Sequence, residues 1–351
     1  MSGEDTFRVS RRELLKRGGL LGVGAMAGAT LLAACSEEPR SESQPQAAPK
    51  SGERRKVIFV THDNNPFFVP VIKGLQEFGK LRGWETQFLG PPKHDVQQTV
   101  EMQANAIAAK PNAVGFTRVD TTSFDANIKR AQEQGIFVIL FNTASAGHRS
   151  LGLAYVGQEF ISAGQASGLQ AAKHAHEITG KKDGLIVLGT IAPGHSALEQ
   201  RMEGARQGIA QYNKQNGTNF TTDVLATATD QNEAIGKIDA KWQKDSDRIV
   251  GFAHADFGHW FTGIWIEDRG LKGKVANGGF DLVQGALEAI KGGTAQWSIG
   301  QNPYAQGWVT SALIDMQLEA SYPPFDYDTG AEVVDASNID AVTEREKRFS
   351  K

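Results

Sequence analysis

Polar and aromatic side chains stand directly after several short apolar runs of the sequence, and their chemistry is that of a binding site. The first group is THDNNPFF at residues 61–68, in which two adjacent phenylalanines follow a polar stretch. Amides, carboxylates and a guanidinium offer donors and acceptors in fixed planes, and phenylalanine rings offer flat apolar faces. A neutral polyhydroxylated molecule needs this combination, because each hydroxyl group both donates and accepts. The candidate ligand-binding residues are Asn65, Phe67, Phe68, Asn142, Arg201, Asp256, Asp281 and Gln301.

Each candidate also has an ordinary structural explanation. Phe67 and Phe68 could begin a helix and pack inward, Asp256 could cap a helix or shape a turn, and Arg201 could be a solvated helix charge. The shared position of the candidates after apolar runs favours a common site instead. The sequence leaves open whether a further set of residues reaches the ligand: Arg118, His195, Glu199, Trp260 and Trp297.

The sequence lacks the signatures of the common catalytic sites. It contains no G-x-S-x-G elbow, no H-E-x-x-H pair and no G-x-x-x-x-G-K-[ST] phosphate loop. The eight histidines are scattered, and His254 and His259 have no third metal ligand close in sequence. We therefore expect a protein that is not an enzyme and that binds neither a cofactor nor a metal ion.

The segments that must position these side chains alternate between short β-branched runs and longer amphipathic ones. Apolar residues recur every three or four positions in the longer segments, which predicts helices, and the short runs predict strands of parallel sheets covered on both faces. The predicted strands are 57–60, 86–89, 113–116, 137–141, 185–188, 224–226, 249–253, 275–278 and 297–299. The predicted helices are 71–80, 96–109, 124–134, 163–178, 198–213, 233–244, 262–268, 283–291 and 305–319.

This alternation runs twice and predicts an α/β fold of two doubly wound, Rossmann-like lobes with parallel sheets. About three hundred residues remain after the N-terminal segment, which fits two domains at the usual size of about 100 to 200 residues each. Ligands of open parallel sheets bind beyond the carboxyl ends of the strands, where the candidate residues stand.

Residues 1–35 read as an export signal rather than as part of a folded domain. Basic residues in SRRELLK, at residues 10–16, precede a small-residue apolar run that ends in LAAC. Charge, apolar run and small-residue cleavage site occur in this order in export signals. SRRELLK resembles the twin-arginine motif and LAAC resembles a bacterial lipobox, although a general secretory route stays open. We expect lipidation of Cys35 and an exported protein, anchored by lipid to the outer face of the cell membrane.

Composition bounds the remaining alternatives. Residues 36–55 are rich in Ser, Pro, Gln and charge, which predicts a flexible tether. The net charge of −3 gives no basic surplus for a nucleic-acid partner. Cys35 is the single cysteine, so no disulfide forms within one chain.

Four motifs of the body resemble the sugar-binding proteins of bacterial ABC importers, of the ribose-binding type. They are NNPFF, the R-x-x-G of Arg201 to Gly204, GGFD ending in Asp281, and IGQNP containing Gln301, and the resemblance runs from residue 56 to about residue 334. It implies the type I periplasmic binding protein fold, in which two lobes joined by three hinge strands close around a ligand. The implied N-terminal lobe is 56–157 plus 302–329, the implied C-terminal lobe is 158–301 plus 330–351, and the hinge crossings fall near 155–158, 301–303 and 328–330.

The same resemblance implies roles for individual residues. Asn65 would bond to ligand hydroxyls, while the two phenylalanines that follow it would sandwich the apolar face of the ligand. Arg201 would donate from the second lobe, Asp281 would accept from paired hydroxyls, and Gln301 would bond to the ligand at a hinge. The implied function is that of a binding protein, expected to be a monomer, that delivers its ligand to an ABC permease.

Two departures from the family pattern bear on the ligand. Phe141-Asn142 stands where ribose binders carry an Asp-Arg pair, and Ala255 stands where they carry an Asn before the residue equivalent to Asp256. The absence of this charged Asp-Arg pair argues against ribose itself. Asn142 can still donate and accept hydrogen bonds, and Phe141 is expected to add apolar wall to the site. We expect a pentose, a tetrose or a linear polyol such as a pentitol or tetritol. A ligand sensor that docks on a membrane receptor is the alternative, whereas a repressor would need a basic helix-turn-helix where the export signal stands.

Overall fold

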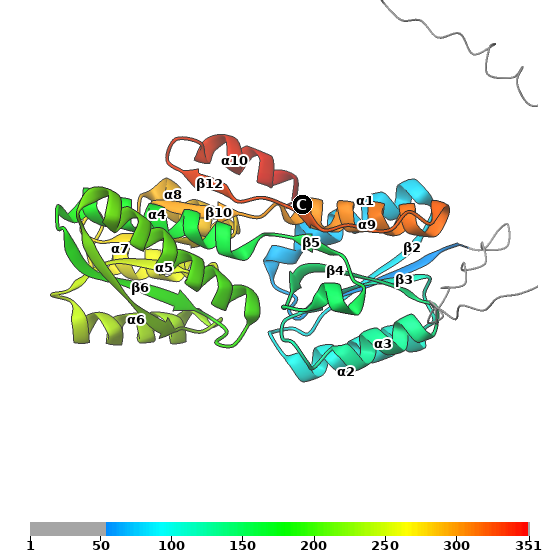
Figure 1. Cartoon of the computed structure of the whole chain (residues 1–351). Helices are drawn as coiled ribbons and strands as arrows, with labels where there is room; N and C mark the ends of the chain where they lie inside the picture. The colour runs from blue at the N-terminus through cyan, green and yellow to red at the C-terminus, as the bar shows by residue number, and fades with distance from the viewer. Residues whose placement is uncertain (1–53, 350–351) are drawn as a thin grey trace, which may run out of the picture. The chain divides into compact units, whose positions relative to one another are not determined.

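The computed structural model describes residues 54–349, and its first sheet belongs to the N-terminal lobe (Figure 1). The strand order is β11-β5-β4-β3-β1-β2, and all of the pairs are parallel. The strands are β1 (Lys56–Val60), β2 (Glu85–Leu89), β3 (Ala113–Arg118), β4 (Phe137–Ala144), β5 (Tyr155–Gly157) and β11 (Tyr327–Asp328).

Helices cover both faces of this first sheet (Figure 1). On one face, α2 (Val96–Ala108) and α3 (Asp125–Glu133) bury Ile107 and Ile128 against the strands. On the other face, α1 (Val69–Arg82) and α9 (Pro303–Ala320) lie side by side, although more than two hundred residues separate them in the chain. Because both faces are covered, the strands need apolar residues on both sides, which explains their continuous apolar runs.

The second sheet forms the C-terminal lobe and has the order β12-β10-β9-β8-β6-β7. Only β12 is antiparallel to its neighbour. Its strands are β6 (Asp183–Thr190), β7 (Asn219–Ala226), β8 (Ile249–His254), β9 (Ala276–Phe280), β10 (Trp297–Gly300) and β12 (Glu332–Asp335). The helices α4 (Phe160–Thr179) and α5 (Ser196–Asn216) cover one face, and α6 (Gln231–Asp245) and α7 (His259–Asp268) cover the other. A further cluster joins α8 (Gln284–Gly292) to α10 (Ile339–Glu346).

The chain passes between the two sheets three times, after β5, after β10 and between β11 and β12. One buried side chain ties these crossings together. Gln158, from the first crossing, donates through Nε2 to the carbonyl of Gly330 at 2.9 Å and to that of Gly300 at 3.3 Å. The positions of these three crossings are compatible with the lobes predicted from the sequence, 56–157 plus 302–329 and 158–301 plus 330–351.

The α/β two-lobed fold predicted from the sequence is confirmed, and every predicted helix and strand overlaps an observed one. The sequence did not predict β5, β11, β12 or α10, which are short and carry little periodic signal. The predicted signal at 1–35, with Cys35, lies outside the described residues, as does most of the tether at 36–55. The last tether residue, Arg55, is held by Glu319 at 2.7 Å and so belongs to the N-terminal lobe. Within the described part of the chain, no helix combines the length and the apolar character needed to cross a membrane.

Candidate functional site

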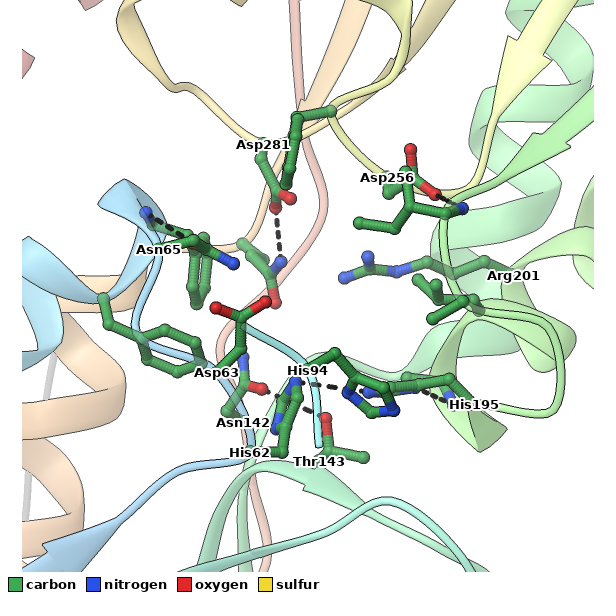
Figure 2. A pocket seen from close by; sticks show the side chains of 18 of the residues that line it. His62, Asp63, Asn65, His94, Asn142, Thr143, His195, Arg201, Asp256 and Asp281 are labelled. Atoms are coloured by element: carbon green, nitrogen blue, oxygen red, sulfur yellow. Dashed lines mark hydrogen bonds between the residues drawn. The ribbon is translucent and has the colours of Figure 1, made fainter. Parts of the chain in front are cut away.

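A cavity of about 70 Å³ lies where the carboxyl ends of the parallel strands of both sheets meet. Figure 2 shows Asn65 and Asp63 on one side of this cavity and Arg201 and Asp256 on the other. This volume lies below the usual range of about 300–1,000 Å³ for ligand pockets, so the present arrangement of the lobes has no room for an oligosaccharide. The structure brings all eight predicted ligand-binding residues into its lining: Asn65, Phe67, Phe68, Asn142, Arg201, Asp256, Asp281 and Gln301.

The turn after β1 supplies an amide and two aromatic rings. Asn65 caps the short 3₁₀ helix Pro66–Phe68 by accepting from the Phe67 backbone N–H at 2.9 Å. Its side chain also hydrogen-bonds the carboxylate of Asp63, which leaves one N–H of Nδ2 for a ligand. Phe67 and Phe68 are buried and meet edge to face at 87°, with their centroids 5.0 Å apart. Both rings line the cavity. The opposite apolar wall comes from Phe160 and Phe257 of the other lobe.

A chain of side-chain amides crosses the hinge and ends on Asp281. Asn142 Nδ2 donates to Gln306 Oε1 at 3.1 Å, and Gln306 Nε2 donates to Gln301 Oε1 at 3.2 Å. Gln301 Nε2 then donates to Asp281 Oδ1. All four side chains are buried, so each bond is made away from water, where such networks are stiff and intolerant of a missing partner. The network holds a carboxylate of one lobe in register with an amide of the other.

Asn142 and Asp281 also share a backbone feature. Both have positive φ, 61° and 73°, in the left-handed region that non-glycine residues seldom occupy. Such conformations concentrate at binding sites, where the surrounding structure holds them. At Asn142 the hydroxyl of Tyr155 fixes the backbone by donating to the Asn142 carbonyl at 2.8 Å.

Arg201 projects from α5 into the cavity and is 4 % exposed. Its Nε and Nη2 atoms donate to Gln158 Oε1 at 3.2 and 2.9 Å, and Nη1 donates to the Ala255 carbonyl at 3.0 Å. The guanidinium lies 4.2 Å from the centroid of the Phe280 ring. These bonds use three of the five N–H groups, so two remain to donate to a ligand. The nearby Gly204 is needed because a Cβ there would collide with the backbone of α4.

Three carboxylates face this single arginine. Asp256 accepts from the backbone N–H groups of Ile191 and Gly258, both at 2.8 Å, while burial raises its pKa to about 7. Burial also raises the pKa of Asp281, an effect that the positive charge of Arg201 opposes. Asp63 is buried in the cavity wall and burial raises its pKa as well. Asp63 was not among the residues predicted from the sequence, although it follows β1 as Asp281 follows β9.

Three histidines also meet at the cavity, and the sequence analysis did not group them. His62 follows β1, His94 lies in the loop between β2 and α2, and His195 is the N-cap residue of α5. The Nε2 atoms of His62 and His195 are 3.3 Å apart. Long stretches of sequence separate these residues, so the only signal that could have predicted their meeting is their common position after parallel strands.

Other residues raised by the sequence lie away from the cavity. Phe141, expected to add apolar wall, is instead fully buried in the core against Phe59, and this part of the prediction was wrong. Adjacent residues of a strand point to opposite sides, so Asn142 reaches the cavity and Phe141 cannot. Trp297 donates to Ser167 in the core, and the side chain of Trp260 packs against Gly285.

Two charged residues left open by the sequence have local roles. Arg118 is buried and binds Asp125 at 2.7 Å together with three backbone carbonyls, which makes it a clamp for the loops after β3 and β4. Glu199 accepts from the Gly194 backbone N–H at 3.0 Å and so braces the loop before α5. Neither residue lines the cavity; of the residues left open by the sequence, His195 does.

Comparisons with known proteins agree with this architecture. The chain is 26% identical over 301 residues to the xylose/arabinose-binding protein of Sulfolobus acidocaldarius, covering 81% of this chain and 72% of that one. It is 25% identical over 286 residues to the ribose import binding protein of Bacillus subtilis, covering 81% and 88%. The crystal structure of a carbohydrate transporter from Acidothermus cellulolyticus, in complex with myo-inositol, superposes with a TM-score of 0.71 at 23% identity, covering 85% of this chain and all of that one.

The family model for the periplasmic binding protein domain matches residues 57–321, which span both lobes and most of the chain. Two mainly parallel sheets, joined by three chain crossings and with a polar and aromatic cavity between the carboxyl ends of their parallel strands, are the structural counterpart of that match. The chain therefore belongs to the periplasmic binding protein family, whose members bind solutes and catalyse no reaction.

Proposed function

We propose that this chain is the solute-binding lipoprotein of an ABC importer, which captures one small neutral carbohydrate between its lobes and delivers it to a permease. One observation carries the proposal. The cavity combines Arg201, three aspartates and amide groups with aromatic residues from both lobes. Hydroxyl groups need both donors and acceptors, and the C–H faces of a carbohydrate need flat apolar surface.

The charge of the cavity supports a neutral ligand. Asp63, Asp256 and Asp281 face one guanidinium, so carboxylate and phosphate groups of a ligand would meet more negative charge than positive. Sugar acids and sugar phosphates are therefore disfavoured. A hydroxyl group, in contrast, donates to a carboxylate and accepts from Arg201 or Asn65.

The ligand we favour is a pentose, a tetrose or a linear polyol. The relatives named for xylose, arabinose and ribose support a small sugar, and the structural neighbour bound to myo-inositol supports a polyol. No second charged clamp stands beside Asn142, whose amide is already bonded to Gln306 and Thr143. An open-chain polyol asks for no clamp on a ring oxygen, which favours a pentitol or tetritol.

Binding without chemistry explains the arrangement of the two lobes. The ligand bridges Asn65, Asn142 and the aromatic rings of one lobe to Arg201 and Asp281 of the other. Only the closed arrangement satisfies both sets of bonds, so the ligand selects it in proportion to that extra affinity. Gln158 couples the two events, because the same side chain ties the hinge crossings and holds Arg201.

The proposal places this domain outside the cytoplasmic membrane, tethered through lipid on Cys35 and acting as a monomer that docks on a permease. A receptor-docked sensor would use the same cavity and the same closure.

A thermal-shift screen tests the ligand class. The purified chain is heated with pentoses, hexoses, tetritols, pentitols and hexitols, because a ligand of the native state raises the melting temperature by mass action. We expect one class of small polyol or sugar to stand out, and we expect the corresponding sugar acid to give no shift. If no neutral carbohydrate shifts the transition, or if the acids shift it more, the proposal is wrong.

A further inference from the structure

The cluster of His62, His94 and His195 has no role in the carbohydrate site as we have described it. His62 and His195 are buried, and His94 is half-buried. The three ring centroids form a triangle with sides of 5.5, 4.8 and 5.4 Å, and one ligand nitrogen from each ring lies within 4.8 Å of the others. Figure 2 shows the rings of His94 and His195 side by side at one end of the cavity. Among the described residues, this is the group of histidine and acidic side chains with metal-binding geometry.

The separation of the nitrogens fits a tetrahedral metal ion. Zinc binds imidazole nitrogen at about 2.0–2.1 Å, so two ligands at a tetrahedral angle lie about 3.3–3.4 Å apart. The Nε2 atoms of His62 and His195 are 3.3 Å apart. His94 is the least buried of the three, so its ring has the most freedom to turn toward the other two.

We propose that His62, His94 and His195 bind a divalent transition metal ion such as Zn²⁺, with its fourth coordination position open to the cavity. Three protein imidazoles with one open position form a site that accepts a water or a ligand oxygen. The surrounding charge favours a cation, because Asp63, Asp256 and Asp281 also line this cavity and Arg201 is its single guanidinium. This inference does not depend on the carbohydrate proposal.

The present hydrogen bonds set a small cost against metal binding. His195 Nδ1 accepts from the Ala197 backbone N–H at 3.2 Å. Coordination through Nε2 places the proton of a neutral imidazole on Nδ1, so this bond is lost. The hydrogen-bond contact between the Nε2 atoms of His62 and His195 is also lost, because both nitrogens then bind the metal. Three bonds from imidazole nitrogen to the metal ion replace these two hydrogen bonds. His62 Nδ1 has no partner in the structure, so coordination costs His62 no bond there.

The three ligands come from both lobes, which gives the ion a structural consequence. His62 and His94 belong to loops of the first sheet, and His195 stands between β6 of the second sheet and α5. An ion held by all three rings must hold the lobes in the closed arrangement. A metal ion and a carbohydrate that both require closure stabilise each other's binding.

The test is a titration of the untagged full chain, stripped with a chelator, with ZnCl₂ by calorimetry and with Co²⁺ by visible absorption. We expect one ion per chain, the intense absorption bands of tetrahedral Co²⁺, and a zinc-dependent rise in melting temperature. Loss of an outer-shell partner weakens metal sites about 10–100-fold, so removing one imidazole should weaken zinc binding by about 100-fold or more. The variants are His94→Ala, which removes the least buried ring, and His195→Asn, which keeps a side chain suited to the helix cap. His176→Ala is the matched control: this half-buried histidine of α4 contacts Tyr212 and does not line the cavity, so the variant should bind zinc like the wild type.

The outcomes separate clearly. Zinc binding that is lost in both cluster variants and kept in the control supports the site. Absence of stoichiometric zinc binding to the wild type, or equal binding by all variants, overturns it. If the cluster variants bind zinc normally but lose carbohydrate binding, the imidazoles are hydroxyl ligands and the metal site is also refuted, while the carbohydrate proposal stands.

Discussion

Replacing Asp281 with asparagine tests the centre of the proposed site with the smallest change of shape. Asp281 is buried at the end of β9, accepts from Gln301 and lines the cavity. The amide oxygen of an asparagine can still accept from Gln301, so the amide chain from Asn142 is preserved. Its NH₂ group then faces the ligand, where the carboxylate would have accepted from two neighbouring hydroxyls.

The expected loss follows from those two bonds. A hydrogen bond to a charged group contributes about 1.5–3 kcal/mol, and the amide restores only part of two such bonds. A net loss of about 2–4 kcal/mol corresponds to an affinity lower by roughly 30- to 700-fold, at about 1.4 kcal/mol per tenfold. The stability of the unliganded protein should not fall, because the substitution removes a buried charge whose desolvation is unfavourable.

Calorimetric titration with the ligand found in the thermal-shift screen measures the affinity, and urea unfolding without ligand measures the stability. Asp268→Asn, at an exposed position at the end of α7, is the matched control and should change neither quantity. An affinity within threefold of the wild type would remove Asp281 from the site. A fall in unliganded stability large enough to account for weaker binding would assign Asp281 to the fold instead.

Three further predictions follow from single contacts. Burial raises the pKa of Asp256 from 3.8 to about 7, so between these pH values the native state holds a proton that the unfolded state releases. As the pH rises from about 4 to about 7, the wild type should therefore lose a few kcal/mol of stability relative to Asp256→Asn. Parallel pH dependences of the two proteins in urea unfolding would contradict this. Gly204→Ala places a Cβ against the backbone of α4 and should destabilise the protein by about 1–3 kcal/mol. Gly236→Ala has open space around it on α6 and should be neutral or stabilise the protein by up to about 1 kcal/mol. Denaturation midpoints compare the two variants, and equal effects would refute the packing argument. Gln158→Leu removes the side-chain acceptor of Arg201 and both hydrogen bonds to the hinge carbonyls. Ligand affinity, measured by calorimetry, should therefore fall about 10- to 100-fold. An unchanged affinity would show that Gln158 does not position the arginine.

The sequence predicted the architecture because its signals are local. Apolar runs alternating with amphipathic segments specify strands and helices through short-range periodicity, and parallel connectivity requires the covering helices. The same reasoning predicted the eight candidate residues, since each follows a predicted strand or begins the next helix and parallel strands end at a common edge. The sequence also contains the R-x-x-G motif that ends in Gly204, and the structure supplies the reason for its glycine, since a Cβ there would collide with the backbone of α4.

Only the tertiary structure decided which side of a strand each residue faces and which residues distant in sequence contact each other. Phe141 and Asn142 are neighbours in sequence, yet one packs in the core and the other lines the cavity. A shift of one residue reverses the face of a strand, and composition does not specify that shift. The amide chain that ends on Asp281 depends on two glutamines, Gln301 and Gln306, at the second crossing between the lobes. Their roles become visible only when α9 is seen packed on the first lobe.

The histidine cluster shows the same division in its sharpest form. The sequence contains eight histidines without a ligand-spacing motif, and it therefore predicted no metal site. The fold places His62, His94 and His195 at the ends of strands from two different sheets and brings their rings together. Local periodicity determines which segments form strands and helices, whereas the docking of two lobes determines which strand ends face each other, because that contact depends on the packing of the whole chain.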